Sequence, residues 1–434
     1  MDKGLKEYLA QAVDELPVAD PHSHLSEDKI SGSLMEVAAY HWIMSEFHSV
    51  GMDYEILLPE SSLSDEEKLA AYVPYFKKIN NTASAWCVKR VFADLYGFRD
   101  ELDESNYREL LNCAARETAR PDWADYVVKK TNIKKFVTSV GNATRTGAVR
   151  PDFGLMVDLH YLFNPSMALD VYPWFGDYYK DETKYLDALE KIGGRPVRCA
   201  RDINAALEAF LVPLISGRTR YFNVVIFSEF LFALPDAVDV DRIVDRNSKG
   251  MELSSDEMKT LVAYTTWNIL KILDSMRATL QICAGAEYQV CGGRSLSQYR
   301  HDWVGETIKT CYKFPNIQFD FMTASAIMYH ELAVAAKMIR NVHLETMWWH
   351  TYVPALMENL YLGLEIVPLP KLGGFFCDGY YVEFTYAKFQ MFKKALVNVL
   401  ARKVEEDYFT PERAVAVAGA LLMDNPSGLY HLDG

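Results

Sequence analysis

Short apolar or β-branched runs recur along the chain, and each gives way to a polar or glycine-containing turn and then to a longer helical pattern. Runs of this kind are typical of buried strands, and their alternation with helical segments indicates a parallel sheet with helical crossovers. Eight such units predict an α/β fold, the TIM (β/α)8 barrel. The candidate strands cover residues 17–25, 133–141, 153–162, 220–230, 278–287, 316–325, 341–350 and 373–384.

The candidate strands are unevenly spaced. Residues 26–130 separate the first from the second, which is far more than one crossover helix needs, and they carry helical patterns throughout. We therefore predict a helical insertion subdomain after the first strand, beside the mouth of the barrel. A second long insertion, at about 163–219, separates the third strand from the fourth. No linker divides the chain, so residues 1–434 are expected to form one barrel domain.

Composition narrows the class of protein and its partners. The formal charge is −14 over 434 residues, which argues against nucleic acid as a partner. No run reaches the roughly 18 uninterrupted apolar residues of a membrane helix, so no membrane partner is expected. The seven cysteines include no CxxC pair, and their odd number is typical of reduced thiols. The N-terminal stretch lacks the basic start and apolar run of a signal peptide, so a cytoplasmic location is expected.

Two histidines stand one residue apart in "PVADPHSHLSEDK", at the end of the first candidate strand. Alternation along a strand puts His22 and His24 on the same face, so both imidazoles can reach one ion. The last candidate strand contains "GGFFCDGYY", in which Asp378 stands between apolar residues and a glycine. Barrel active sites lie at the C-terminal ends of the strands, so Asp378 would face the histidine pair. The alternative is two unrelated strand-end histidines and an aspartate that caps a turn.

A histidine pair on the first strand with an aspartate on the eighth resembles the amidohydrolase superfamily of metal-dependent barrels. The stretches "FPNIQFDFMTAS", "NVHLETMWWHTYVP", "GGFFCDGYYVEFTYAKF" and "ALLMDNPSGLYHL" are similar to the C-terminal third of the uronate (glucuronate) isomerase family. "PVADPHSHLS" and "AYHW" are similar to its N-terminal region. The similarity is clear over residues 314–431, recognisable over 17–45 and weak between them. It implies a metal-dependent barrel that isomerises aldose to ketose, glucuronate to fructuronate and galacturonate to tagaturonate.

The same resemblance implies roles for individual residues. His22, His24 and Asp378 hold or adjoin a divalent metal, zinc in the first place, and Asp378 also serves as the base or positions the ring oxygen. The partner is a small-molecule sugar acid, and a homo-oligomer stays open because large sugar isomerases often associate. Besides Asp378, the implied catalytic residues are His41, Trp348, Trp349 and Tyr380, and Trp42 is implied in substrate binding.

The chain departs from the family pattern where arginines would bind the carboxylate of the substrate. Tyr380, Glu46 and Met156 occupy the usual arginine positions, and Cys283 stands where the family has a histidine on the fifth strand. Arginine is the side chain best suited to bidentate binding of a carboxylate, so a uronate would need another cation. The candidates follow the second and fifth predicted strands: Arg145, Arg294, Arg300 and His301.

Two other functions stay open. The missing arginines favour an isomerase of another sugar acid or a metal-dependent hydrolase of the amidohydrolase type. The absence of a lysine on the fourth strand and of a histidine on the fifth argues against a two-metal hydrolase. A barrel without catalytic activity, kept for assembly or binding, is the third reading, and the intact set of His22, His24 and Asp378 argues against it.

Overall fold

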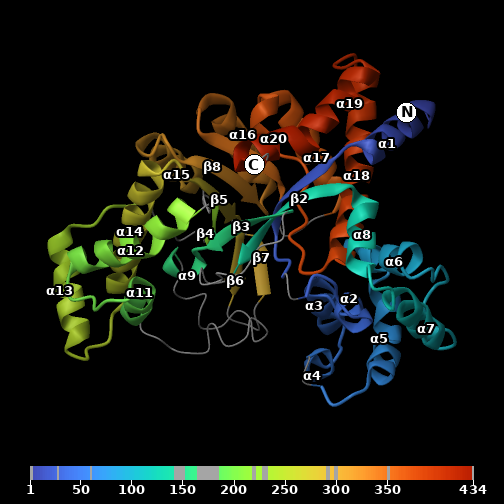
Figure 1. Ribbon diagram of the computed structural model, residues 1–434, viewed down its shortest axis with the longest axis horizontal. Helices are drawn as coiled ribbons and strands as arrows, with labels where there is room; N and C mark the ends of the chain where they lie inside the picture. Colours follow the sequence, from blue (N-terminus) through green and yellow to red (C-terminus); the bar gives the residue numbers. More distant parts are fainter. Residues whose placement is uncertain are drawn as a thin grey trace.

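A curled parallel sheet of seven strands forms the centre of the protein in the computed structural model (Figure 1). The structure describes residues 3–26, 29–58, 61–140, 152–163, 185–217, 221–226, 233–289, 294–297, 302–348 and 352–432. In spatial order, the strands are β1 (Val18–Ser23), β2 (Ile133–Val140), β3 (Phe153–Asp158), β4 (Tyr221–Ile226), β5 (Thr279–Ala284), β8 (Gln318–Thr323) and β9 (Val342–Met347). They coincide with the first seven predicted strands, although β3 ends at Asp158 and a helical turn, α9 (His160–Phe163), follows it.

The eighth predicted strand, at residues 373–384, is wrong as a strand but right as the segment that closes the barrel. Its first part bonds to β9, where the Gly373 N–H donates to the Leu344 carbonyl at 2.8 Å. Its last part bonds to β1, where the Asp378 N–H donates to the His22 carbonyl at 2.8 Å. From Val382 onward the chain is already helical. The fold is therefore a TIM-type barrel with an irregular eighth member.

Side chains replace part of the backbone ladder in this closing segment. The Cys377 N–H donates to Asp20 Oδ1 at 3.1 Å instead of to a carbonyl of β1. Pro21, which follows Asp20 on β1, has no N–H that could join the backbone ladder. The carboxyl group of Glu345 is packed directly against Gly373, where a Cβ would lie 1.8 Å from Glu345 Oε2. Only glycine fits such an approach, so position 373 cannot carry the side chain that a regular strand would have there.

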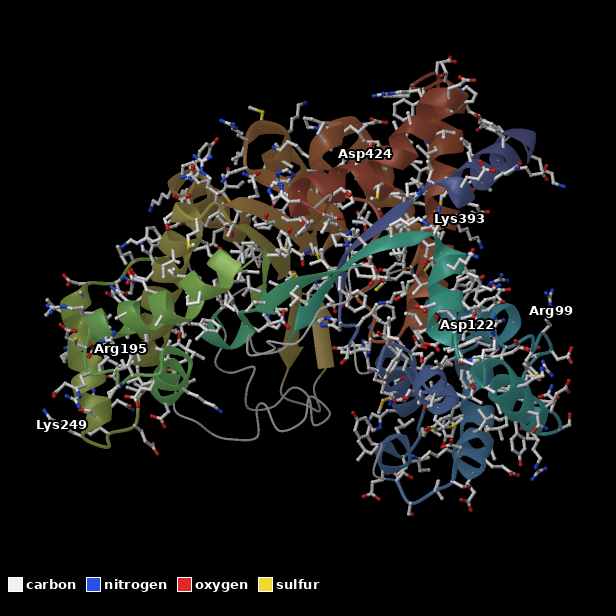
Figure 2. The ribbon with its side chains drawn as sticks, in the orientation of Figure 1. Arg99, Asp122, Arg195, Lys249, Lys393 and Asp424 are labelled. Carbon is white, nitrogen blue, oxygen red and sulfur yellow. The ribbon has the colours of Figure 1, made fainter. Side chains whose placement is uncertain are left out.

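Helices surround the sheet. α1 (Lys3–Glu15) packs on the long helix α18 (Val382–Glu405), which also contacts α17 (Val353–Ile366). The crossover helices elsewhere are α11 (Tyr185–Gly193), α12 (Ala200–Gly217), α13 (Ala237–Ser248), α14 (Ser255–Ser275), α15 (Trp303–Lys313) and α16 (Ala326–Met338). Charged side chains are found on the outer surface, where the exposed Arg99 and Lys249 lie toward opposite ends of the molecule (Figure 2). Within the described ranges, no helix combines the length and the hydropathy needed to cross a bilayer.

The segment after β1 is helical, as the pattern predicts. Its helices group on one side of the molecule, beside α18 (Figure 1). Two of them begin with a capping box, in which Ser33 pairs with Glu36 and Ser64 with Glu67, so the sequence fixes where they start. That they form a separate subdomain over the barrel mouth stays a prediction. The helices are α2 (Leu34–Ala38), α3 (His41–Ser49), α4 (Tyr54–Leu57), α5 (Asp65–Ile79), α6 (Ala83–Asp94), α7 (Tyr107–Thr118) and α8 (Trp123–Thr131).

An unforeseen hairpin extends β5 at the mouth of the barrel. β6 (Ala286–Gln289) follows Gly285 directly and pairs in antiparallel fashion with β7 (Arg294–Ser297). The opposite end, the floor, is closed by the C-terminal elements α19 (Pro411–Gly419), η3 (Ala420–Asp424) and α20 (Asn425–Tyr430). The six described cysteines are free thiols, as the spacing predicts: Cys87, Cys113, Cys199, Cys283, Cys311 and Cys377.

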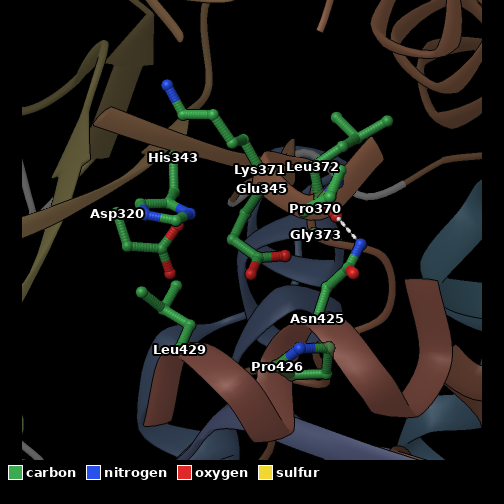
Figure 3. A pocket seen from close by; sticks show the side chains of 10 residues that line it. All are labelled: Asp320, His343, Glu345, Pro370, Lys371, Leu372, Gly373, Asn425, Pro426 and Leu429. Carbon is green, nitrogen blue, oxygen red and sulfur yellow. Dashed lines mark hydrogen bonds between the residues drawn. The ribbon is translucent and has the colours of Figure 1, made fainter. Parts of the chain in front are cut away.

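A small cavity at the floor has an acidic lining. The carboxyl groups of Asp320 and Glu345 face it, and its lining also includes His343, Pro426 and Leu429 (Figure 3). Burial raises the pKa of Asp320 to about 7 and that of Glu345 well above its usual value. His343 Nε2 lies 3.0 Å from Gln318 Oε1. Burial and then the charge of Lys371 lower the pKa of His343 to about 4.

His343 is expected to make the protein sensitive to mild acid. The folded protein keeps this imidazole neutral down to about pH 4, whereas the unfolded chain binds a proton below about pH 6.5. Stability from the neutral form is therefore complete above pH 6.5 and is lost as the pH falls toward 4. One proton corresponds to about 1.4 kcal/mol per pH unit. We measure the free energy of unfolding in urea at several pH values between 4.5 and 7.5. It should change less steeply with pH for His343→Gln than for the wild type. The same pH dependence in both proteins would contradict this assignment.

Candidate metal centre

Two histidines and an aspartate meet where β1 ends and the closing segment turns into α18. Asp378 Oδ1 lies 3.3 Å from His22 Nε2 and 3.1 Å from His24 Nε2. The potential ligand atoms of the three side chains all lie within 4.8 Å of one another. His22 is buried on β1, and His24 follows the strand at the edge of the mouth. The structure thus brings together the three residues that the sequence assigns to the metal.

The backbone at Asp378 is unusual. Its φ is +47°, in the left-handed region that few residues other than glycine, asparagine and aspartate adopt. This turn directs the carboxylate toward the histidine pair, while its N–H still bonds to the carbonyl of His22. The His24 N–H donates to the Gly379 carbonyl at 2.9 Å. Two backbone bonds therefore fix the aspartate against both histidines.

The electrostatics of these three residues fit a divalent cation. Burial opposes charge on Asp378, but its bonds to His22 and His24 and the nearby Lys388 bring its pKa well below the usual value. Burial likewise opposes charge on His22, but Asp378 outweighs it and raises the pKa. At neutral pH the carboxylate is ionised and attracts positive charge. Two imidazoles with one carboxylate form a donor set that zinc accepts at catalytic sites, with a position left for substrate.

A buried lysine that the sequence reasoning missed supports the aspartate from behind. Lys388, on α18, donates from Nζ to the carbonyl of Cys377 and, at 3.2 Å, to that of Asp378. Its Nζ also lies 3.8 Å from the ring centroid of Trp42. Burial lowers its pKa, although Asp378 opposes this. The ammonium group is thus bound to the turn that carries the ligand and to Trp42.

Aromatic side chains from the inserted helices and the closing segment surround the histidines. Tyr380 stacks on His24, with ring centroids 4.8 Å apart and planes at 14°. His41 contacts Tyr380 edge to face at 5.4 Å. Burial and then Lys388 lower the pKa of His41 to about 3, so its imidazole is neutral near pH 7. Tyr40, which sequence reasoning did not single out, accepts from the Tyr380 N–H at 3.2 Å.

Trp348 belongs to an apolar cluster at the ends of β4, β5, β8 and β9. It packs there with Cys283 and Phe376, among others. Phe376 in turn contacts the ring of His22 edge to face at 6.0 Å. Cys283 is buried, and burial raises its pKa well above the usual value, so the thiol is neutral. Trp348 therefore lies in an apolar cluster that adjoins the candidate metal ligand His22 through Phe376. That it walls a substrate pocket stays a prediction.

A second histidine and carboxylate lie at the end of β3. His160 Nδ1 accepts the Val225 N–H at 3.0 Å, and His160 Nε2 lies 3.6 Å from Asp158 Oδ1. Burial lowers the pKa of His160. The charge of Asp158 raises the pKa of His22, and the charge of His22 lowers the pKa of His160. Asp158 and His160 therefore lie at the same end of the barrel as the candidate metal ligands.

The predicted substrate-binding cations lie on the mouth hairpin or outside the described residues. Arg294 begins β7, so its backbone lies on the hairpin at the mouth. Arg145, Trp349, Arg300 and His301 lie outside the described residues.

Two of the positions that carry arginine in the resembling family lie away from the mouth or are engaged elsewhere. Met156 is fully buried in the floor cluster with Tyr221 and Tyr430, so a substrate at the mouth does not meet it. Glu46 accepts a hydrogen bond from Thr82 Oγ1 at 2.7 Å. Only Tyr380, of the three, is in contact with a candidate metal ligand.

The fold and the donor set define a TIM-type barrel with a candidate metal centre at its mouth. Solved structures with the same fold include uronate isomerase from Thermotoga maritima, with a TM-score of 0.82, 14% identity and 99% and 98% of the two chains covered. Glucuronate isomerase from Caulobacter crescentus follows with a TM-score of 0.79, 16% identity and coverage of 99% and 94%. Uronate isomerase from Bacillus halodurans has a TM-score of 0.75 and 17% identity, with 99% and 96% of the two chains covered. No protein-family model and no curated protein matches the chain by sequence.

Proposed function

We propose that this protein is a metal-dependent aldose–ketose isomerase of hexuronates, which converts glucuronate to fructuronate and galacturonate to tagaturonate. The proposal is carried by one observation: His22, His24 and Asp378 converge on one point at the mouth of a barrel whose fold is that of uronate isomerases. Supporting it, the fold match covers 99% of this chain, insertions included.

The reaction moves a proton between neighbouring carbons through an enediol. It needs a base near C2, stabilisation of the oxyanion that develops, and a group that holds the uronate carboxylate. A divalent ion held by His22, His24 and Asp378 would polarise the carbonyl and hydroxyl oxygens of the open-chain sugar. Proton transfer and the binding of the carboxylate are carried out by side chains of the protein.

Asp378 and His41 have protonation states suited to proton transfer. Asp378 is an ionised carboxylate at neutral pH, because its pKa lies well below the usual value. We assign to it the proton at C2. His41 is a neutral imidazole, with a pKa of about 3. A neutral imidazole donates at one nitrogen and accepts at the other, so we assign to His41 the proton that passes between the two sugar oxygens.

The aromatic residues and a cation complete the proposed pocket. Tyr380 orients His24 by stacking, Trp42 lies over Lys388 at the inserted helix, and Trp348 walls the mouth. A cationic side chain binds the uronate carboxylate, and the candidates follow the second and fifth predicted strands. They are Arg145, Arg294, Arg300 and His301, and the backbone of Arg294 is on the mouth hairpin.

Turnover of uronates by the zinc-loaded protein tests the proposal. Incubation with D-glucuronate or D-galacturonate, followed by NMR, should show the matching ketose. D-glucose, which lacks the carboxylate, is the control. Loss of one charge-assisted hydrogen bond of roughly 1.5–3 kcal/mol should lower kcat/KM for glucose by about 10- to 100-fold or more. Metal-loaded protein that produces no ketose from either uronate would contradict the proposal, and other sugar acids, lactones and N-acyl substrates would then be screened.

A further inference from the structure

We infer that Gln281 and Tyr430 are positioning residues for the metal ligand His22, connected to it by a hydrogen-bond chain from the C-terminal helix. The hydrogen bonds place a hydrogen on Nδ1 of His22. Nε2, which lies 3.3 Å from Asp378 Oδ1, is therefore the nitrogen that would ligate the ion. This inference rests on the proposed metal centre and names two residues, remote from the mouth, that prepare it.

The hydrogen-bond directions follow from the chemistry of an amide. Gln281 Nε2 donates to the Pro21 carbonyl at 2.7 Å and to the Tyr430 hydroxyl at 2.6 Å. Both hydrogens of the amide nitrogen are thereby used, so the amide cannot be turned around without losing two bonds. Gln281 Oε1 then faces His22 Nδ1, at 2.8 Å. An amide oxygen only accepts, so the hydrogen must be on Nδ1 of the imidazole.

Tyr430 anchors this arrangement from the floor. Its hydroxyl donates to Asp320 Oδ2 at 2.5 Å and so presents a lone pair to Gln281. Asp320 is one of the two carboxyl groups that face the floor cavity, and Leu429, next to Tyr430, lines the same cavity (Figure 3). Tyr430 is the last residue of α20. Hydrogen bonds through the barrel interior therefore connect the C-terminal helix at the floor with His22 at the mouth.

Every residue of this hydrogen-bond chain is buried, so the orientation of the His22 ring is strictly fixed. Asp320, Gln281 and Tyr430 are 0% exposed and His22 is 2% exposed. Water cannot replace a lost partner easily at such a depth, so a broken link leaves a buried polar group unsatisfied. His24 differs, because its ring hydrogen-bonds to Asp378, stacks on Tyr380 and meets the ring of His22 edge to face. The two histidines thus have different supports, and only His22 depends on the floor.

Such a partner matters for metal binding. A histidine that ligates through one nitrogen is oriented by a hydrogen bond at the other, and loss of that bond typically lowers metal affinity by about 10- to 100-fold. Gln281→Met keeps the length of the side chain but removes both the acceptor and the donors. Tyr430→Phe removes only the hydroxyl that holds the amide.

The test is the zinc affinity of the full chain, measured by competition with a chelator. We expect Gln281→Met and Tyr430→Phe to weaken zinc binding by about 10-fold or more. The matched control is Tyr221→Phe: the Tyr221 hydroxyl donates to the backbone carbonyl of Tyr430, so it supports the same helix without belonging to the chain. Tyr221→Phe should bind zinc as the wild type does, even where all three variants lose thermal stability.

Each outcome decides. Wild-type affinity in both Gln281→Met and Tyr430→Phe would overturn the inference, and so would an equal loss in Tyr221→Phe, since that would indicate a structural effect of α20. Should Gln281→Met fail to fold, the conservative Tyr430→Phe gives the answer, and NMR of the zinc-loaded protein adds a second readout. The Nδ1–H of His22 should be protected from exchange in the wild type and in Tyr221→Phe, but not in Tyr430→Phe. A wild-type protein that binds no zinc would refute the metal centre itself, which is a different result.

Discussion

Asp378→Asn should weaken zinc binding strongly and, with it, the turnover of glucuronate. Asparagine tolerates the left-handed backbone at this position, where φ is +47°, so the turn should be kept. What is lost is the negative charge on the one oxygen that lies 3.3 Å from His22 Nε2 and 3.1 Å from His24 Nε2. Removing the group to which we assign the roles of ligand and base should lower kcat by roughly 10²–10⁴-fold.

Zinc titration of Asp378→Asn and turnover of glucuronate measure the two effects in the same samples. Asp158→Asn is the control, because Asp158 lies at the same end of the barrel, beside His160, and outside the three-residue donor set. It should leave zinc affinity close to that of the wild type. Unchanged zinc binding by Asp378→Asn would remove this residue from the metal centre.

Lys388→Met will impair the site, whereas the same change at Lys403 will only destabilise the fold. Both lysines are on α18, and they are 1% and 0% exposed. Lys388 donates to the carbonyls of Cys377 and Asp378 on the ligand-bearing turn. Lys403 bonds instead to Glu365 and lies over Tyr361. Methionine fills similar space but cannot donate a hydrogen bond, so Lys388→Met takes the ammonium donor from two buried carbonyls. The carboxylate released by Lys403→Met, that of Glu365, is exposed.

The expected loss of stability is about 1–3 kcal/mol for Lys388→Met, the cost of an unpaired buried polar group, and smaller for Lys403→Met, whose carboxylate partner is exposed. The difference lies in function: only Lys388→Met should weaken zinc binding and slow turnover by an order of magnitude or more. Urea unfolding gives the first quantity, and chelator competition with the uronate assay gives the second. If both variants lose zinc affinity equally, or neither does, Lys388 has no specific role at the turn.

The sequence predicts those parts of the barrel in which local pattern and tertiary position agree. Apolar runs such as that at β5 are buried on every residue, and they read as strands because nothing in them favours a turn. The segment at 373–379 carries the same apolar signal, but its geometry depends on the Glu345 carboxyl group packed against Gly373. No local pattern shows that contact, so the closing segment could not be distinguished from a strand.

The candidate metal ligands His22 and His24 were visible in the sequence because a histidine pair at a strand end is a local signal. Lys388 was not, since a lysine inside a helix is normally solvated. A signal did exist: Lys388 stands on the apolar stripe formed by Phe384, Phe392 and Ala395, where a charge must be buried. Gln281 and Tyr430 leave no comparable trace, because their roles depend on contacts with residues more than a hundred positions away.

The most direct test of the proposed metal-dependent isomerase activity is to titrate metal-free protein with zinc. Bound metal and glucuronate isomerisation are measured together. Turnover should rise in proportion to bound zinc and stop rising at one ion per chain, because His22, His24 and Asp378 form the single three-residue cluster of this kind found among the described residues. Full activity without metal would contradict the account, and so would a fully loaded protein that leaves glucuronate and galacturonate unchanged.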